Sequence, residues 1–546
     1  MIIIYSLSNF LFKMVHRLLD KQVIILSLLS LLNGDYPAKD ELPINMTKEE
    51  ITRINEIYTM GRDTDPPPFP VRNVAEFERM QGVIIRYPFG ISLPLITEIS
   101  ENVIIYCLVS VSEQNTAENL LQNGGVNMNN IEFVLGNTDS YWTRDYGPWW
   151  VVDGQRNMSI VDFTYNRPRP NDNDAPLKIS NYLNVPYFAT DIVHAGGNYM
   201  TDGLGIAASS TLVFEENEIT SDSVLQIMQS YYGIIDYHLL SDPNNTYIDH
   251  IDCWAKYLSS TKVLVREVPA NHEQFDEIEE VAAYFSNSMN RWEEFWEVYR
   301  VWSPANEPYT NSLILNEKVL VPLTGGSWDG EALDIYQDAM PGYEIIGFTG
   351  SWQSTDALHC RIKGLPDLEM LQIFHNPVND STAPSESGYE VKVYIDDLSN
   401  TGLIEDSIKI FWKPSDTEFW SISQMNRIDI PDSINTHIGW IPVSAFTGNI
   451  QYYIQTADSS GRVENHPLAG FHEFLAMPGE NPCYAWLLGD LDNTSKIDIF
   501  DILILVDIIS MGISFGICPS HVADFNGDNV LDGIDIAMLA SQIINP

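Results

Sequence analysis

Basic residues are scarce in this 546-residue sequence, which has 29 Lys and Arg against 75 Asp and Glu. The formal charge of -46 repels nucleic acid and anionic lipid, and it attracts cationic ligands. We therefore expect no nucleic-acid partner. A cationic substrate fits this charge, although acidic charge spread over an exported protein would also serve solubility alone.

Long apolar runs are absent after the N-terminal region, because no later stretch reaches the roughly 18 residues that a membrane-spanning helix needs. The N-terminus has the layout of an export signal, with basic residues at positions 16–21 followed by an apolar run at residues 23–32. We expect residues 1–34 to be a signal peptide, with Met14 as an alternative start. The sequence thus predicts a secreted protein without a membrane span, either free or attached to a cell surface or a larger complex.

Cysteine is also rare, and the odd number of five leaves at least one thiol unpaired. Cys107 lies in an apolar stretch typical of a buried strand, and Cys253 lies beside a short polar motif. Both cysteines therefore suit buried structural positions. Cys483 and Cys518 precede two acidic loops at matching places, which makes a disulfide between them plausible in an oxidising compartment. Cys360 is then the remaining candidate for chemistry.

The chain length suggests one large domain with smaller ones attached. Residues 35–75 form a polar, Pro-rich lead-in segment. Residues 76–367 alternate short apolar strands with helical patterns, which is typical of an α/β domain. The clearest helix in this domain is predicted over residues 272–299, with Asn271 as its N-cap.

Two smaller regions follow the α/β domain. Residues 368–479 predict a β-sandwich, because apolar and polar residues alternate at 390–396, 407–412 and 449–454. Residues 480–546 hold two copies of an acidic loop that is followed by an apolar helix, which predicts a small helical module.

Five polar segments recur within the α/β domain. They start at residues 142, 196, 250, 310 and 358, which lie 54, 54, 60 and 48 residues apart. Such near-regular spacing predicts five supersecondary modules that each bring one polar loop to a shared centre.

These segments contain the residue types needed to hydrolyse a guanidinium group. That reaction needs carboxylates to hold the planar cation, a thiolate to attack its carbon, and an acid/base to protonate departing ammonia. Asp145, Asp252, Cys360 and His250 supply these groups. Taken singly, each of them also fits a structural role such as a surface ion pair, a turn or a core position.

Four words containing these residues occur in order along the chain: YWTRDYGPW at 141–149, HAGGN at 194–198, HIDCW at 250–254 and DALHC at 356–360. Together they resemble the bacterial peptidylarginine deiminases of the Porphyromonas type. That family lies within the guanidino-group-modifying superfamily, which also contains agmatine deiminases. The likeness covers roughly residues 70–367, and the predicted β-sandwich is similar to the immunoglobulin-like domain that follows in that family.

The resemblance implies a five-bladed α/β propeller, the pentein fold, and it assigns roles to individual residues. It makes Cys360 the nucleophile and His250 the general acid/base, with no metal needed for the chemistry. Nearby cations are expected to favour the thiolate. The other implied roles are guanidinium clamps at Asp145 and Asp252, orientation by Asn311, a channel wall at Trp142, and close backbone approach at Gly196 and Gly197.

Arg167 and Arg169, in the word NRPRP at 166–170, bear on the substrate. In the family that the sequence resembles, matching arginines hold the free α-carboxylate of a C-terminal arginine, a task that suits a guanidinium fork. The predicted reaction is therefore conversion of arginine to citrulline and ammonia, through a cysteine thiouronium intermediate, on peptides or proteins ending in arginine. The alternatives are an agmatine deiminase, a hydrolase of free arginine, a basic loop without a substrate role, and an inactive surface-binding protein.

The two acidic loops place oxygen-bearing side chains at the spacing of calcium loops, with Asp in the last ligand position. Paired loops of this kind resemble a dockerin module, which implies a cohesin-type scaffold protein as a partner. The predicted calcium ligands are Asp490, Asp492, Thr494, Asp498 and Asp501 in the first loop, and Asp524, Asn526, Asp528, Asp532 and Asp535 in the second.

Overall fold

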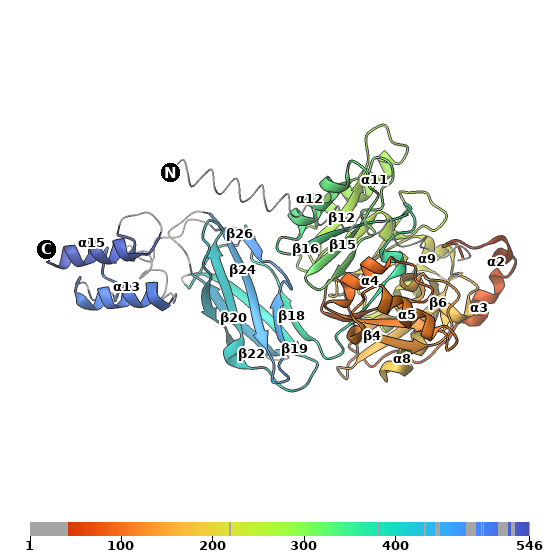
Figure 1. The fold of residues 1–546 in the computed structure, drawn as a ribbon, viewed down its shortest axis with the longest axis horizontal. Coiled ribbons are helices and arrows are strands. Elements are labelled where there is room, and N and C mark those ends of the chain that lie inside the picture. The colour runs from red at the N-terminus through yellow and green to blue at the C-terminus, as the bar shows by residue number, and fades with distance from the viewer. Residues whose placement is uncertain are drawn as a thin grey trace. The chain divides into compact units, whose positions relative to one another are not determined.

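The structure is a computed structural model that describes residues 42–546, except 218–219, 381, 386, 431–432, 443–447, 477–487, 493, 495, 512–521, 526–529 and 545–546. The expected signal peptide, Cys483, Cys518, Asn526 and Asp528 lie outside these residues. The chain divides into two compact units, Met1–Met370 and Leu371–Pro546 (Figure 1). The sequence places the corresponding boundary after residue 367.

Five small β-sheets of matching topology form the first unit. In each sheet, a short strand runs antiparallel to its neighbour, and that neighbour runs parallel to the next strand. The sheets are β1 (Arg72–Asn73), β5 (Trp149–Val152), β6 (Met158–Tyr165) and β7 (Tyr187–His194); β8 (Met200–Thr201), β9 (Ile206–Ser210) and β10 (Asp236–Leu240); β11 (Ala255–Tyr257), β12 (Lys262–Glu267) and β13 (Glu297–Trp302); β14 (Leu313–Leu315), β15 (Lys318–Leu323) and β16 (Glu344–Thr349); and β17 (Lys363–Pro366), β2 (Met80–Arg86), β3 (Ile104–Val109) and β4 (Ile131–Leu135).

The fifth sheet joins the two ends of the unit, because β17 pairs with β2. The second strands of the sheets are apolar and buried, as in β12 and β15, since helices cover one face and the interior of the unit covers the other. The five modules predicted from the spacing of the polar segments are therefore present.

Helices connect and cover these sheets (Figure 1). For example, α11 packs against β12 and β13, and α12 packs against β13 and β16. The helices of the first unit are α2 (Lys48–Thr52), η1 (Ile54–Glu56), α3 (Ile57–Met60), α4 (Leu93–Ser100), α5 (Gln114–Asn123), η2 (Met128–Asn130), α6 (Thr143–Tyr146), α7 (Pro170–Asn173), α8 (Ala175–Leu183), η3 (Gly196–Asn198), α9 (Leu212–Glu215), α10 (Ser221–Tyr232), η4 (Ile251–Cys253), α11 (Phe275–Asn287), α12 (Asp329–Ala339) and η5 (His359–Arg361).

The predicted helix at 272–299 is too long, because α11 begins at Phe275 and ends at Asn287. The Asn290 side chain accepts hydrogen bonds from the backbone N–H groups of Trp292 and Glu294, which closes a turn. The following residues pair in parallel with β12 as strand β13. Sheet pairing therefore overrides the helical periodicity of the apolar residues.

Two antiparallel sheets form the β-rich part of the second unit, and they share one apolar core. Strands occupy the three predicted segments, and β19 shows the expected alternation of buried and exposed residues. The immunoglobulin-like identity stays a prediction. The sheets are β18 (Leu371–His375), β19 (Tyr389–Asp397), β23 (Ser433–Ile441) and β22 (Asn426–Ile430); and β21 (Ser421–Gln424), β20 (Lys409–Pro414), β24 (Gly448–Ala457), β25 (Val463–His466) and β26 (His472–Ala476), with η6 (Glu405–Ser407) before β20.

Two helices, α13 (Ile499–Met511) and α15 (Gly533–Ile544), follow the two acidic loops as predicted. Their apolar residues, including Leu505 and Leu539, pack into one small core. Among the described helices of the whole chain, none combines the length and the apolar character that crossing a membrane requires.

Asn316, between β14 and β15, ties two sheets together. Its amide donates to the Met80 carbonyl at 2.9 Å and accepts from the Met80 N–H at 2.8 Å, and its backbone φ is 55°. We expect Asn316→Ala to lower the free energy of unfolding by about 2–4 kcal/mol, because it leaves a buried donor and acceptor unpaired and strains the backbone. Asn316→Gly loses the same two hydrogen bonds but tolerates the positive φ, so denaturant titration should give it a cost about 1 kcal/mol smaller than that of Asn316→Ala. Equal stability of wild type and Asn316→Ala would contradict this role.

Candidate active site

The five polar segments meet because each lies directly before the first strand of a sheet. Helix α6 precedes β5, η3 precedes β8, η4 precedes β11, residues 310–312 precede β14, and η5 precedes β17. Helix α6 contacts both η3 and η5, and η3 contacts η4. Topologically equivalent positions of five modules thus converge on one buried centre.

Cys360 and Asn311 are neighbours in this centre. The Cys360 thiol lies 3.3 Å from the Asn311 amide nitrogen and 3.7 Å from a carboxylate oxygen of Asp252. The Asn311 side-chain oxygen accepts from the backbone N–H groups of His359 and Cys360, at 3.0 and 3.3 Å. Asn311 therefore orients the turn that carries the thiol, the kind of role that the sequence predicts for it.

Gly197 marks the point where Asp145, Asp252 and His250 come together. A Cβ atom built on Gly197 would lie 2.6 Å from Asp145 Oδ1, 2.7 Å from His250 Nδ1 and 3.2 Å from Asp252 Oδ2. The Gly197 N–H also donates to Asp145 Oδ1 at 3.2 Å. Gly196 is equally constrained, since a Cβ there would lie 2.1 Å from the Arg144 carbonyl oxygen. Both glycines are required for this close backbone approach.

The centre contains polar atoms without a hydrogen-bond partner. Asp145, Asp252, His250 and Cys360 are each at most 3 % exposed. Within the described part of the chain, Asp145 Oδ2, His250 Nε2 and the indole N–H of Trp142 lack such a partner, and His250 Nδ1 has a 3.5 Å contact with Asp145 Oδ1. Buried polar groups are normally paired, so these atoms mark a place for a polar ligand.

Burial in the unliganded centre disfavours the charged forms of three of its titratable side chains. Burial and the charge of Asp252 raise the pKa of Asp145 well above its ordinary value. Burial, together with Asp252 and Asp145, likewise raises the pKa of the Cys360 thiol, and burial lowers the pKa of His250 to about 3. The expectation that nearby cations favour the thiolate is wrong here, since the charges with the largest effects on the thiol are carboxylates. A bound cation would reverse these effects on Asp145 and Cys360.

Asp252 remains ionised because a buried network supports it. Burial raises its pKa, but the hydrogen bond from His359 and the surrounding positive charges lower it further, so the net shift is downward. His359 Nδ1 lies 2.7 Å from Asp252 Oδ2, and His359 Nε2 lies 2.6 Å from Glu76 Oε2. Lys256 and Arg144 form ion pairs with Glu76, at 2.8 and 2.7 Å.

Sequence reasoning missed the positioning roles of His359 and Glu76. The only feature of the sequence that points to His359 is its position directly before the candidate nucleophile. Glu76 lies at the start of the domain, far from each of the polar motifs, so nothing in the sequence points to it. Both ring nitrogens of His359 face carboxylate oxygens. Each of these contacts needs a proton, so either both nitrogens of His359 carry an N–H group or one of the two carboxylates is protonated. The network therefore holds Asp252 in one orientation.

Trp142 lies beside the centre at the start of α6, with its ring 4.2 Å from the Tyr141 ring. The Arg361 guanidinium packs over the rings of Tyr141, Trp142 and Trp352, at 5.0, 5.5 and 5.1 Å from their centroids. This stacking holds the Trp142 ring in place, and its role as a channel wall stays a prediction.

Arg167 and Arg169 are both buried, and the lead-in segment contacts both. The Arg169 guanidinium pairs with Glu50 of α2 at 2.7 Å and donates to the carbonyls of Pro43 and Asn45. Arg167 donates to the Ile44 carbonyl at 3.0 Å, and its positive charge acts on both Asp145 and His250. Arg167 is therefore close to the catalytic centre, whereas the Nε and Nη2 donors of Arg169 are already engaged.

Three cysteines of the described chain, Cys107, Cys253 and Cys360, are free and buried. Cys107 lies within β3, where burial raises its pKa to about 12, so it is a core residue. The Cys253 thiol lies 3.6 Å from Asp252 Oδ1. The disulfide predicted for the other two cysteines falls outside the described residues and stays a prediction.

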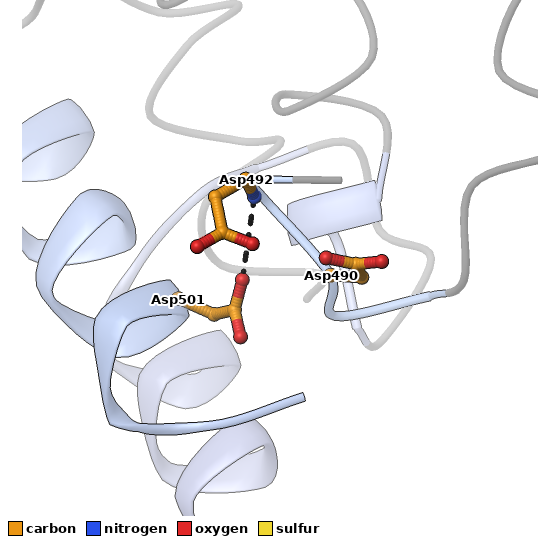
Figure 2. Close-up of side chains that lie close together, drawn as sticks. All are labelled: Asp490, Asp492 and Asp501. Carbon is orange, nitrogen blue, oxygen red and sulfur yellow. Dashed lines mark hydrogen bonds between the residues drawn. The ribbon is translucent and has the colours of Figure 1, made fainter. Parts of the chain in front are cut away.

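The acidic loops of the second unit are separate from this centre in sequence. Asp490, Asp492 and Asp501 each offer a carboxylate oxygen, and these atoms lie within 4.8 Å of one another (Figure 2). Asp501 accepts from the Leu491 and Asp498 N–H groups at 2.7 Å, and Asp535 accepts from the Phe525 and Asp532 N–H groups at 2.9 Å. The last acidic residue of each loop thus accepts the same pair of backbone hydrogen bonds. Thr494 donates its backbone N–H to Asp490 and Asp492, and Asp524 follows the short helical turn at 522–523.

Comparison with known proteins identifies a family for the first unit. The sequence profile of the Porphyromonas-type peptidyl-arginine deiminases matches residues 90–364, half of the chain. A Legionella pneumophila protein provisionally named an agmatine deiminase is 25% identical over 285 residues, covering 46% of this chain and 78% of that protein. A Yersinia pseudotuberculosis protein of the same provisional name is 22% identical over 263 residues, covering 40% and 72%.

The fold has a close counterpart among solved structures. The agmatine deiminase of Enterococcus faecalis superposes with a TM-score of 0.51 at 17% identity, covering 56% of this chain and 99% of that chain. At this identity the likeness establishes the fold alone, and it confirms the predicted five-bladed α/β architecture of the first unit.

The space around Gly197 yields a direct test of the centre. We expect Gly197→Ala to lower the turnover of a guanidino substrate by at least a hundredfold. The methyl group of the introduced alanine would push the Asp145 and His250 side chains out of their present positions. Ala is tolerated well at other glycines with open surroundings, and Gly330→Ala on α12 meets no atom within 4 Å. This second variant is the control and should retain wild-type kcat/KM. Undiminished turnover in Gly197→Ala would mean that the reaction takes place elsewhere.

Proposed function

The chain belongs to the Porphyromonas-type peptidyl-arginine deiminase family, and on this premise we propose that it hydrolyses the guanidinium of arginine at the C-terminus of peptides or proteins. The products are peptidyl-citrulline and ammonia. Membership in the family makes it a guanidino-group deiminase, and the narrower choice of substrate is our proposal. The observation that carries the deimination reaction is the convergence of Asp145, Asp252 and His250 around Gly197, with the Cys360 thiol 3.7 Å from Asp252 and polar atoms left open for a ligand.

A guanidinium cation supplies what the unliganded centre lacks. Asp145 and Asp252 hold its N–H groups, and its charge offsets the like-charge repulsion that raises the pKa of Asp145. The same charge lowers the pKa of the Cys360 thiol, which the two carboxylates otherwise raise. The substrate itself thereby makes the nucleophile more acidic. Because Asp145 loses a proton as the cation binds, substrate affinity should rise with pH through the pKa of Asp145.

The reaction then proceeds in two halves. The proton of the Cys360 thiol passes to neutral His250, and the sulfur attacks the guanidinium carbon to form a tetrahedral adduct. The C–N bond breaks as His250 returns the proton to the departing nitrogen, which leaves ammonia and an S-alkyl thiouronium. His250 next takes a proton from water, and the hydroxide adds to the same carbon. C–S cleavage then returns that proton from His250 to the sulfur, and the O–H proton of the adduct is lost to the solvent, which leaves the ureido product and the neutral thiol.

Agmatine is the second candidate substrate, and one observation favours it. The Nε and Nη2 donors of Arg169 already bind Glu50 and backbone carbonyls, so they are not free for a substrate carboxylate. Agmatine has no carboxylate and would not need them. The names of the relatives point in the same direction.

Turnover assays separate these candidates. We expect ammonia and a ureido product from a peptide ending in arginine, with less from agmatine and least from a peptide whose arginine is internal.

Cys360→Ala should reduce turnover by at least about a thousandfold, because it removes the nucleophile. Cys107→Ala, a change in the core of β3, serves as the matched control and should keep turnover.

Arg167→Ala should lower the ratio of kcat/KM for the arginine-terminated peptide to kcat/KM for agmatine by about tenfold, because it removes a cation that faces the carboxylate, whereas its effect on the charges of Asp145 and His250 is common to both substrates. A preference of the wild-type protein for agmatine would overturn the choice of peptide substrate. Absence of any ureido product would overturn the deiminase reaction itself.

We propose separately that the two acidic loops bind calcium. The fit rests on an all-oxygen donor set at Asp490, Asp492 and Asp501 and on the shared arrangement of the two loops. Thr494 and Asp498 complete the first loop, and Asp524, Asn526, Asp528, Asp532 and Asp535 would form the second. Attachment to a cohesin-type scaffold and export from the cell remain predictions of the sequence.

Calcium titration after chelation tests these loops. We expect two binding events by calorimetry, with one of them lost in Asp490→Asn or Asp501→Asn because each removes a ligand charge. Asp507→Asn lies on α13 outside the loops and should change nothing. Deimination should continue without calcium. Unaltered binding in the loop variants would contradict the assignment.

A further inference from the structure

Glu50 occupies the side of Arg169 that a substrate carboxylate would use. Arg169 Nε lies 2.7 Å from Glu50 Oε1, and Arg169 Nη2 lies 3.3 Å from Glu50 Oε2. This two-point contact on one edge of the guanidinium is the usual way in which a carboxylate binds arginine. The chain therefore presents its own carboxylate to this residue.

Backbone carbonyls of the lead-in segment take the remaining donors on that side. Arg169 Nη2 donates to Pro43 at 2.7 Å and to Asn45 at 3.2 Å, and Arg167 Nε donates to Ile44 at 3.0 Å. By contrast, Arg169 Nη1 has no hydrogen-bond partner among the residues that the structure describes. The lead-in segment thus occupies donors on one side of Arg167 and Arg169, while Arg169 Nη1 stays a buried donor without a partner among the described residues.

The position of Glu50 is fixed by its own helix. Glu50 is the third residue of α2, and its carboxylate accepts from the Thr47 N–H at 2.7 Å while the Thr47 hydroxyl accepts from the Glu50 N–H at 3.2 Å. This reciprocal capping box holds the side chain toward Arg169. Burial by itself would raise the pKa of Glu50, but the hydrogen bonds from Arg169 and Thr47 lower this pKa by more, so the net shift is downward. Glu50 is therefore a preorganised anion at neutral pH.

We propose that Glu50 is a specificity-determining residue whose carboxylate competes with the carboxylate of the substrate for Arg169. This inference rests on the proposed function, in which the arginine pair receives the far end of an arginine-terminated substrate. A substrate with a carboxylate must displace Glu50 from the Nε and Nη2 donors. A substrate without one, such as agmatine, leaves the contact intact. The lead-in segment thus lowers selectivity for carboxylate-bearing substrates.

The catalytic centre adds a reason to expect such displacement. Its key side chains are at most 3 % exposed, and Arg167 links the centre to the lead-in segment through Ile44, which is itself buried. The thiol and the arginine pair are thus both buried before a substrate binds. Residues 43–50 are the segment that contacts the arginine pair, through hydrogen bonds and one ion pair.

The test compares two substrates on one protein preparation. We expect Glu50→Gln in the full chain to raise the ratio of kcat/KM for an arginine-terminated dipeptide to kcat/KM for agmatine by about tenfold, equivalent to ~1.4 kcal/mol. The amide is nearly isosteric and cannot pair as an anion. The ratio cancels the fraction of folded enzyme, so a partial loss of stability does not obscure the result.

Glu49→Gln is the matched control, because Glu49 precedes Glu50 on the same helix but is exposed. It should leave the ratio unchanged. An unchanged ratio in Glu50→Gln would overturn the inference, and so would a lower one, which would show that Glu50 positions Arg169 for the substrate. Failure of the proposed function is distinguishable, because it is read from the wild-type protein: a preference for agmatine overturns the choice of peptide substrate, and no turnover of either substrate would overturn both proposals.

Discussion

Two carboxylates buried side by side impose the constraint on which the site depends. Asp145 and Asp252 approach the same point next to Gly197, where water cannot screen their repulsion. The protein keeps Asp252 ionised through His359, Glu76, Lys256 and Arg144, but within the described residues it gives no comparable cation contact to Asp145 Oδ2. The unliganded centre is therefore neutral at the thiol and at His250, and a planar cation is the ligand that completes its charge balance.

The architecture explains how residues more than 200 positions apart in the chain reach this centre. Each sheet begins with a short antiparallel strand, and a polar segment enters that strand from the middle of the unit. Five repeats of one topology therefore deliver five loops to one place, while helices on the outside cover the sheets. The pairing of β17 with β2 closes the unit and carries Cys360 back toward the chain start.

The surroundings of Arg167 and Arg169 have a different origin. These arginines follow β6, yet the groups that bind them come from the lead-in segment, outside the five-sheet repeat. The buried centre is thus built by the repeated fold, whereas the partners of the arginine pair are not.

Local chemistry in the sequence determined the residue types and much of the architecture. Apolar strands and polar motifs at near-regular spacing were enough to predict the five modules. The motifs that contain His250, Asp252 and Cys360 were enough to propose a catalytic set, whose side chains the structure brings together. Only the tertiary structure decided the end of α11 at Asn287, where strand pairing with β12 replaced helical periodicity. It alone also brought Glu76 to His359 and Glu50 to Arg169, because long-range contacts between ionised side chains leave no periodic signal in the chain.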